Sequence, residues 1–367
     1  MDDFSTNRHA ENLIKIDVTS SPPIRHPDLW FGDGNIVLVA GEIYFKVHQG
    51  LLCRHSTPLQ EGINALEATE DAKLYSIEGK PVLILNDQPK DLCHFLLALY
   101  DGVSSVKHDN HDFEIVSALL RLSTKYRVQH IRNDILRGMS MVWPRNLSAW
   151  EFREADATDS TGVYKPRSVY PHPILVINLA KETGALELLP SAFYDLSRCS
   201  ASEIATGYLP PGSTDRSELH TLADEDLLNT LRGREHASRF LSTFVVNELE
   251  GREASPNCVN KSDVDPFRKR ICQATFEATT FEILRDVNGV VLHRSSDPLF
   301  AIMDADLMQT RADGSGAGGA GGGGRLSLLH RACEPCRMEF TTAVDAARDE
   351  LWHKLPYWFG INLPSWP

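Results

Sequence analysis

The sequence DGNIVLVAGEIYFKVHQGLLCRHS, residues 33–56, predicts a strand, a tight turn, a second strand and a helix, in that order. Residues 36–40 are all apolar, as in a strand that is covered on both faces. Gly41-Glu42 can form a two-residue hairpin turn, because glycine tolerates the positive φ of the first central position. Residues 43–47 are rich in β-branched and aromatic side chains and predict the returning strand. A helical run follows from His48.

Further elements of the same domain follow this hairpin. Thr57 is expected to cap a helix that carries Pro58 at its first position, with Gln60 completing a capping box. Residues 81–85 predict a third strand. The next helix shows an apolar stripe at i, i+3, i+4 and i+7, which is typical of a helix with one buried face. The stripe consists of Leu92, Phe95, Leu96 and Leu99. Two more helices complete the predicted domain.

This order of elements resembles a BTB/POZ domain. That family shows a similar hydrophobic strand pair followed by Phe-x-x-His, a helix and a Ser, and later a Leu-rich helix that ends near an aromatic-x-Gly. The matching positions are Phe45, Val47, His48, Leu52, Ser56, Leu96, Leu99 and Tyr100. The resemblance implies a small sheet with a helical cluster, and it gives His48 a structural role at the strand-to-helix junction. The chain as a whole is similar to BTB proteins of mushroom-forming fungi, in which a helical region follows the BTB domain.

The resemblance implies an N-terminal BTB/POZ domain, and the chain after it reads as mostly α-helical, so the expected fold class is α+β. The start of the chain is polar, a second stretch mixes Pro with acidic residues, and a third is almost entirely Gly and Ala, as in disordered loops. The expected parts are a flexible arm at 1–26, the BTB/POZ domain at 27–143, a linker at 144–173, and a helical region at 174–367 with a disordered Gly-rich loop at 313–325.

Apolar periodicity predicts several helices in the C-terminal region. They span residues 174–181, 185–197, 222–250, 266–285, 298–310 and 336–355. Pro190 is expected to interrupt the second of these. The last residues, PYWFGINLPSWP (356–367), are unusually aromatic. We expect this tail to dock on the helices and bury its rings, because aromatic termini are normally tied down when they are ordered. An exposed aromatic peptide that binds a partner is the alternative.

Cys333-Glu334-Pro335-Cys336 is the sharpest local motif of the chain. A C-x2-C turn directs two thiolates at one point, which suits half of a tetrahedral zinc site. Cys258 and Cys272 can supply the other half, so these four residues are the candidate ligands of a structural zinc ion. Two alternatives stay open, namely ordinary thiols that happen to be close and a redox CxxC pair, although no thioredoxin-like strand precedes the motif.

A second group of metal-binding side chains is the run KHDNHD at residues 107–112. His108 and His111 alternate there with aspartates, and such a cluster can bind metal. A solvated loop with a helix N-cap at His111 or Asp112 is the favoured interpretation, because the run lies between two predicted helices.

Charge and motif content lower the odds of several classes of function. The formal net charge of -13 disfavours direct nucleic-acid binding, because it repels phosphate backbones. No window approaches the ~18 apolar residues of a membrane span. Seven cysteines without a signal peptide predict a cytoplasmic or nuclear protein. GxSxG, GxxxxGK[ST] and HExxH are missing, so we expect no enzyme and no catalytic residues.

The BTB resemblance implies a protein–protein interaction adaptor. Such a domain can pair with itself, and family members recruit cullin-type ubiquitin ligases. Family adaptors use a hydrophobic-x-Glu feature for this recruitment. Leu59-Gln60-Glu61 has the right chemistry here but falls inside a predicted helix, and Thr57-Pro58 replaces the expected aromatic pair. A transcriptional or chromatin regulator that oligomerises through BTB is the alternative, and an enzyme in the helical region ranks third.

Overall fold

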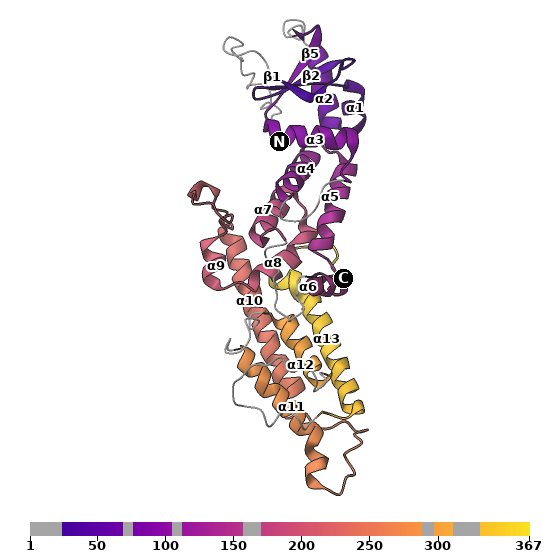
Figure 1. Ribbon diagram of the computed structural model, residues 1–367, viewed down its shortest axis with the longest axis vertical. Helices are drawn as coiled ribbons and strands as arrows, with labels where there is room; N and C mark the ends of the chain where they lie inside the picture. Colours follow the sequence, from indigo (N-terminus) through magenta and orange to yellow (C-terminus); the bar gives the residue numbers. More distant parts are fainter. Residues whose placement is uncertain (1–23, 69–75, 105–111, 157–169, 288–296, 311–330) are drawn as a thin grey trace, which may run out of the picture. The chain divides into compact units, whose positions relative to one another are not determined.

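The computed structural model describes residues 24–68, 76–104, 112–156, 170–287, 297–310 and 331–367. They form a five-stranded sheet near the N-terminus followed by many helices, so the predicted mixture of sheet and helix is confirmed (Figure 1). The chain divides into two compact units. The first comprises Met1–Ser105 and Ala118–Arg132, and the second comprises Val106–Ser117 and Asn133–Pro367. No helix among the described residues is both long and apolar enough to span a membrane.

The sheet of the first unit is built around the predicted hairpin. Its strands are β1 (Ile24–Trp30), β2 (Ile36–Ala40), β3 (Ile43–Val47), β4 (Ser76–Ile77) and β5 (Lys80–Leu85), in the order β1-β3-β2-β5-β4. β2 and β3 are antiparallel, whereas β1 pairs in parallel with β3 and β5 in parallel with β2. Gly41 turns the hairpin with a φ of +52°, as the sequence predicts. β1 and β4 were not expected.

In the described segments of the first part of the chain, five helices lie between or after the strands of the sheet. They are α1 (Gln49–His55), α2 (Thr57–Ala68), α3 (Pro89–Asp101), α4 (Phe113–Lys125) and α5 (Gln129–Val142), the last two of which cross between the units. α2 packs against β5, and α3 packs against β1. Every residue of β2 is buried, which explains its unbroken apolar sequence. All four residues of the predicted apolar stripe on α3 are buried as well.

The N-terminus of α2 differs from the prediction. Ser56, not Thr57, caps the helix, because the Oγ of Ser56 accepts a hydrogen bond of 3.1 Å from the N–H of Leu59. The same hydroxyl donates to the carbonyl of Tyr126 at 2.7 Å, and Ser56 is buried. The residue at the family's Ser position therefore fixes a helix start and ties it to a segment distant in the sequence.

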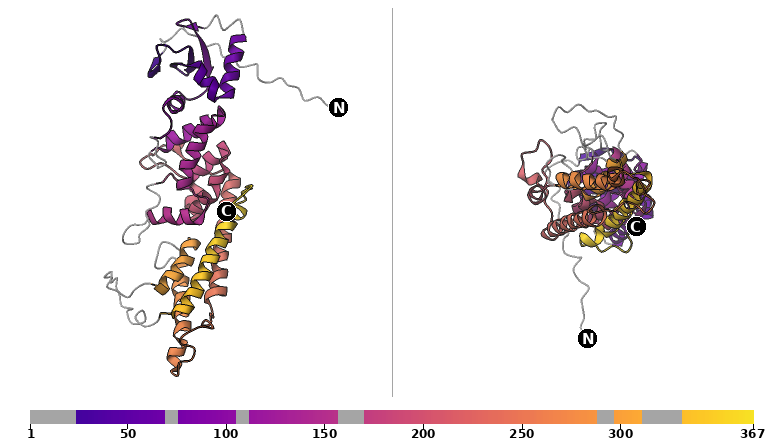
Figure 2. Two further views of the ribbon diagram at one scale, coloured as in Figure 1. Left: turned by 90° about the vertical axis from the view of Figure 1, so that its right-hand side faces the viewer. Right: turned by 90° about the horizontal axis from the view of Figure 1, so that it is seen from below.

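The second unit consists of helices. Its principal elements are α6 (Leu147–Asp156), α7 (Pro173–Thr183), α8 (Leu189–Ser197), α9 (Ala201–Thr206), α10 (Asp224–Phe244), the π-helical turn η5 (Val245–Leu249), α11 (Pro266–Val287), α12 (Pro298–Thr310) and α13 (Glu334–Trp358). α8 packs against α7 and α10, and α13 packs against α10 and α12. Figures 1 and 2 show α10, α12 and α13 side by side. The helices expected from residue 222 onwards are thereby confirmed.

The boundaries between the predicted parts need correction. α6 occupies residues 147–156, inside the predicted linker at 144–173, and its Trp150 and Arg153 are buried. Glu151 and Glu154 are not linker residues, because they form ion pairs within the unit. β1 begins at Ile24, inside the predicted arm at 1–26. The Gly-rich stretch at 313–325 lies outside the described residues.

Two predictions about the C-terminal region have different outcomes. Pro190 does not interrupt a helix, since it occupies the first turn of α8, where no backbone N–H is needed. The aromatic tail docks as expected with Trp358 and Phe359 buried, but the ring of Tyr357 is exposed. The Nε1–H of Trp366 donates to the carbonyl of Trp352 at 2.8 Å, and the two rings stack with centroids 5.7 Å apart. The indole of Trp352 is buried and donates to the carbonyl of Arg145 at 2.8 Å.

Candidate metal centre

The four candidate zinc ligands come together from three separate segments of the second unit. Cys258 lies in a turn that follows η5, and Cys272 lies on α11. Cys333 occupies the N-cap position of α13, and Cys336 belongs to the first turn of that helix. Cys258 and Cys333 lie outside regular helix, so their positions can adjust to a metal ion. Cys272 and Cys336 are held by helical backbone.

The sulfur atoms of this cluster have the spacing of a tetrahedral metal site. All four lie within 4.8 Å of one another. The Sγ of Cys258 is 3.7 Å from the Sγ of Cys272 and 3.7 Å from the Sγ of Cys333. A zinc ion about 2.3 Å from each of four sulfurs sets them about 3.8 Å apart in a regular tetrahedron. The cluster can therefore hold a metal ion without rearrangement of these two edges.

Hydrogen-bond donors surround the sulfurs, as a negatively charged thiolate cluster requires. The N–H of Ser255 donates to the Sγ of Cys336 at 3.3 Å. Cys272 accepts from the N–H of Cys333 at 3.3 Å and from the side-chain amide of Asn260 at 3.4 Å. Cys333 also lies at the N-terminus of α13, where the helix dipole favours negative charge. The surroundings therefore fit a tetrathiolate metal complex.

The environment separates the acidities of Cys258, Cys333 and Cys336. Burial raises the pKa of Cys333, but hydrogen bonds from the backbone of Cys336 and Val259 and from neighbouring thiols outweigh it, and its pKa falls to about 7. Burial raises the pKa of Cys336 and, to a smaller extent, that of Cys258. In the metal-free chain Cys333 thus ionises before Cys258 and Cys336.

The four cysteines also differ in how deeply they are buried. Cys258, Cys272 and Cys336 are buried, whereas Cys333 is half-buried. None of the seven cysteines, all of which lie in described segments, forms a disulfide. Cys333 and Cys336, the two thiols of the alternative redox pair, belong to a larger cluster of four cysteines.

An aromatic and cationic layer supports the helices that carry the cluster. The guanidinium of Arg252 lies 5.4 Å from the ring centroid of Phe276 on α11 and 5.2 Å from that of Phe340 on α13. It also pairs with Glu248 at 3.1 Å. Arg252 therefore joins η5, α11 and α13 beside the cysteines, so the ligand-bearing helices are held together by contacts other than the thiols.

The eight residues matched to the BTB signature all lie in the first unit. Ser56 is buried, and so are the five with apolar side chains, which are Phe45, Val47, Leu52, Leu96 and Leu99. His48 and Tyr100 form a junction, because the Tyr100 hydroxyl lies 2.8 Å from Nδ1 of His48 and accepts the His48 backbone N–H at 3.0 Å. The structural role expected of His48 agrees with this geometry. Sequence reasoning missed its carboxylate partner, Asp33, which lies 3.2 Å from its Nε2.

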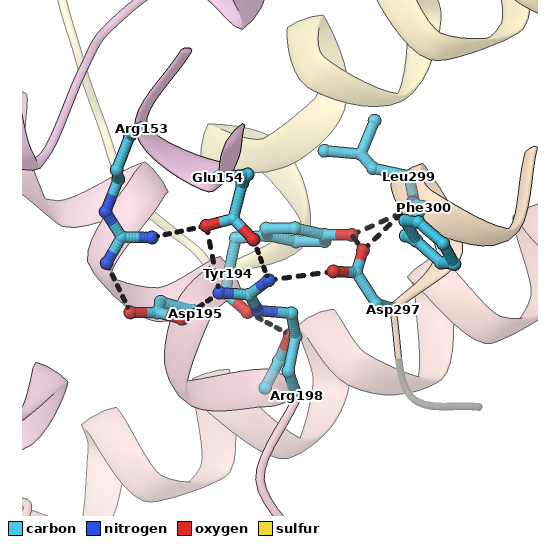
Figure 3. A network of polar contacts seen from close by, with 9 residues as sticks. Arg153, Glu154, Tyr194, Asp195, Arg198, Asp297, Leu299 and Phe300 are labelled. Carbon is cyan, nitrogen blue, oxygen red and sulfur yellow. Dashed lines mark hydrogen bonds and ion pairs between the residues drawn. The ribbon is translucent and has the colours of Figure 1, made fainter. Parts of the chain in front are cut away.

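Sequence reasoning also missed a buried ionic network in the second unit (Figure 3). Arg153 of α6 donates to Asp195 of α8 at 2.9 Å, and Arg198 also pairs with Asp195. Arg198 reaches Glu154 and Asp297 at 2.7 and 2.8 Å. No sequence pattern signals this network, because its members are scattered and each resembles an ordinary surface charge.

Tyr194 extends the network towards α12. Its hydroxyl donates to Asp297 at 2.6 Å and accepts from the N–H of Leu299 at 3.0 Å. Asp297 in turn accepts the N–H of Phe300 at 3.1 Å and so caps α12. Burial and the neighbouring Asp297 carboxylate raise the pKa of Tyr194, so its hydroxyl stays protonated and acts as a donor. The arrangement connects α6, α8 and α12.

His108 and His111, the second group of candidate metal ligands, lie outside the described residues. Comparison with protein-family models found no match to this chain, and neither did comparison with curated proteins.

Proposed function

We propose that this chain is a protein–protein interaction adaptor whose first unit is a BTB-type docking platform. The observation that supports this proposal is the connectivity around β2. A β2–β3 hairpin leads into α1 and α2, and β5 then returns parallel to β2 before α3 begins. This is the order that the sequence resemblance implies, with the signature residues in the core and at the junction of β3 and α1.

Self-association is the first interaction expected of such a platform. β1 is an edge strand whose pairing with β3 is interrupted between Arg25 and Trp30, so part of its backbone is available to another chain. Ile24 exposes 54% of its surface on this strand. An apolar residue on an open edge favours pairing with a second copy through the N-terminal elements, as the family resemblance implies.

Light scattering on the full chain tests self-association. We expect a dimer, and Ile24→Asp should shift it towards monomer, because a charge on the edge strand opposes strand pairing. Leu228→Asp is the matched control, since Leu228 is also apolar and 46% exposed but lies on helix α10, away from the sheet edge. A monomeric parent protein, or equal effects of the two substitutions, would contradict self-pairing through β1.

Recruitment of a cullin-type ubiquitin ligase is a further proposal for the same platform. Leu59 of the Leu59-Gln60-Glu61 feature is buried in α2, so its side chain supports the helix packing and does not face a partner. A cullin would have to bind by other contacts. Affinity purification from the native cell separates the hypotheses: recovery of cullin supports the adaptor, whereas corepressors or DNA-bound proteins support the transcriptional or chromatin regulator. Turnover by the full chain would favour an enzyme.

We also propose that Cys258, Cys272, Cys333 and Cys336 hold a structural zinc ion. The 3.7 Å sulfur separations and the N–H donors support a tetrathiolate ligand set, which zinc prefers in structural sites. Metal analysis of the purified chain should give one zinc per chain. Cys272→Ser should abolish this stoichiometry, and Cys53→Ser, outside the cluster, should preserve it. Protein without stoichiometric zinc would contradict the proposal.

A further inference from the structure

The accessibility of the cysteine cluster is uneven, and the unevenness places one ligand in contact with small solutes. Cys258, Cys272 and Cys336 are buried, whereas Cys333 is half-buried at the N-terminus of α13. A small oxidant therefore reaches the Sγ of Cys333 before it reaches the other three sulfurs. Coordinated or free, the thiolate is the form of cysteine that reacts with oxidants.

The nearest sulfur with a movable backbone is that of Cys258. It lies 3.7 Å from the Sγ of Cys333, and a disulfide needs about 2.05 Å, so the two atoms must approach by about 1.7 Å. Cys258 lies in a turn and Cys333 at an N-cap, outside regular helix. Cys272 is equally close to Cys258, but it is fully buried on α11. The accessible and adjustable pair is thus Cys258 and Cys333.

We propose that the metal centre is a redox-sensitive clasp in which a peroxide joins Cys258 to Cys333 and releases the zinc ion. This inference rests on the proposed zinc site. It adds a modification that leaves the turn around Cys258 tied to the start of α13 by a covalent bond in place of the metal.

The chemistry requires one peroxide molecule and two protons. The Cys333 thiolate attacks one peroxide oxygen, the O–O bond breaks, and Cys333 becomes a sulfenic acid while hydroxide leaves. The Cys258 thiolate then attacks the sulfenic sulfur, forms the S–S bond and displaces a second hydroxide. Two protons convert the hydroxides to water. The sulfurs lose two electrons in total and the peroxide gains them.

Loss of two ligands explains why the metal leaves. After disulfide formation only Cys272 and Cys336 remain as zinc ligands, and two thiolates do not complete a structural tetrahedral site. Metal binding also requires deprotonated ligands, so the remaining thiols take up protons as zinc departs. Reduction of the disulfide restores all four thiolates, and the site can then bind zinc again.

The test begins with zinc-loaded full-length chain, whose metal content is measured before any oxidant is added. Hydrogen peroxide is then added, zinc release is followed with a chromogenic chelator, and the protein is digested with trypsin without reduction. We expect zinc release together with a disulfide between peptide 253–261, which carries Cys258, and peptide 332–337, which carries Cys333 and Cys336. Fragmentation between the last two cysteines identifies the bonded one. A reducing agent and added zinc should restore the metal content.

A histidine substitution tests the reacting thiol, because a Cys₃His set still binds zinc and imidazole does not form disulfides. Cys333→His should slow peroxide-driven zinc release by at least about tenfold, because it removes the reacting thiolate. Cys53→Ser removes a free cysteine outside the cluster and should release zinc at the parent rate. If Cys333→His does not bind zinc, the peptide linkage in the parent chain decides the question.

The outcomes separate this inference from the zinc proposal. Absence of zinc before oxidation contradicts the zinc site itself. Zinc-loaded protein that keeps its metal in peroxide, or that forms a Cys333–Cys336 disulfide, overturns the clasp while the zinc site stands. A Cys258–Cys333 linkage that appears with zinc release and disappears on reduction supports it.

Discussion

Gly233 of α10 lies against the ring of Phe359, and there is no space for a methyl group between them. A Cβ atom at residue 233 would lie 2.0 Å from Cε1 and 2.1 Å from Cδ1 of that ring, whereas carbon atoms in ordinary contact are about 3.5 Å apart. Phe359 is fully buried and stacks on Phe193 with centroids 5.6 Å apart. Gly233→Ala therefore forces the ring of Phe359 out of its site.

The size of this effect follows from two opposing contributions. Expulsion of the ring is comparable to truncation of a buried Phe to Ala, which costs about 3–5 kcal/mol. Alanine in a helix interior is better than glycine by about 1 kcal/mol. The free energy of unfolding of the second unit should therefore fall by about 2–4 kcal/mol.

Scanning calorimetry of the full chain can measure this change, because the transition of the second unit should move to lower temperature. Gly62→Ala is the control, since the nearest side-chain atom, on Leu83, lies 3.8 Å from the new methyl group. That substitution should leave stability unchanged or raise it by up to about 1 kcal/mol. In a Phe359→Ala background, Gly233→Ala should cost nothing. A Gly233→Ala chain as stable as its parent would refute the packing of α10 on Phe359.

Three further predictions concern other polar contacts. Asp195→Asn leaves two buried arginines without their shared carboxylate and should lower the free energy of unfolding by about 3 kcal/mol, measured by urea unfolding with Asp134→Asn, at an exposed ion pair, as a neutral control. Ser56→Ala should cost about 2 kcal/mol in the same assay, because α2 loses its cap and a buried carbonyl loses its donor; unchanged stability would contradict that role. In the metal-free chain, alkylation of Cys333 should increase with pH around its pKa of about 7. Because the pKa of Cys333 is lower in the folded chain, its thiolate contributes stability that is fully present above the ordinary thiol pKa and is lost as the pH falls through about 7. Alkylation that begins only near the ordinary thiol pKa would contradict the lowered pKa.

The hairpin was predictable because every signal for it is local. The apolar run at 36–40, the glycine at residue 41 and the β-branched return strand agree with one another, and the observed strands begin and end where the sequence places them. The helices α10 to α13 were predictable for the same reason, since apolar periodicity is read within one segment.

Features that depend on distant residues were not predictable in this way. α6 looks like a linker because it is rich in charges, and only the presence of Asp195 and Arg198 makes those charges suitable for burial. Thr57 looks like a helix cap, yet the buried carbonyl of Tyr126 favours Ser56, one residue earlier. In both cases a tertiary partner decides between two locally acceptable readings.

The cysteine cluster lies between these extremes. The spacing of Cys333 and Cys336 is a local signal for two ligands directed at one point. Nothing local connects them to Cys258 and Cys272, which have thirteen residues between them and lie in the same half of the chain. The structure confirms that all four sulfurs meet, and the identity of a bound metal stays a prediction.

The ionic network and the cysteine cluster occupy corresponding places in the second unit. α12 and α13 each follow a stretch of chain outside the described residues, and each begins at a cross-link: Asp297 caps α12 and pairs with Arg198, and Cys333 begins α13 and meets Cys258. Joining distant segments costs conformational entropy that grows with the length of the connection. Buried carboxylates and clustered thiolates are costly unless every partner is in place. We infer that these two clusters fix where α12 and α13 start, because an alternative packing of either helix would leave charged groups buried without partners.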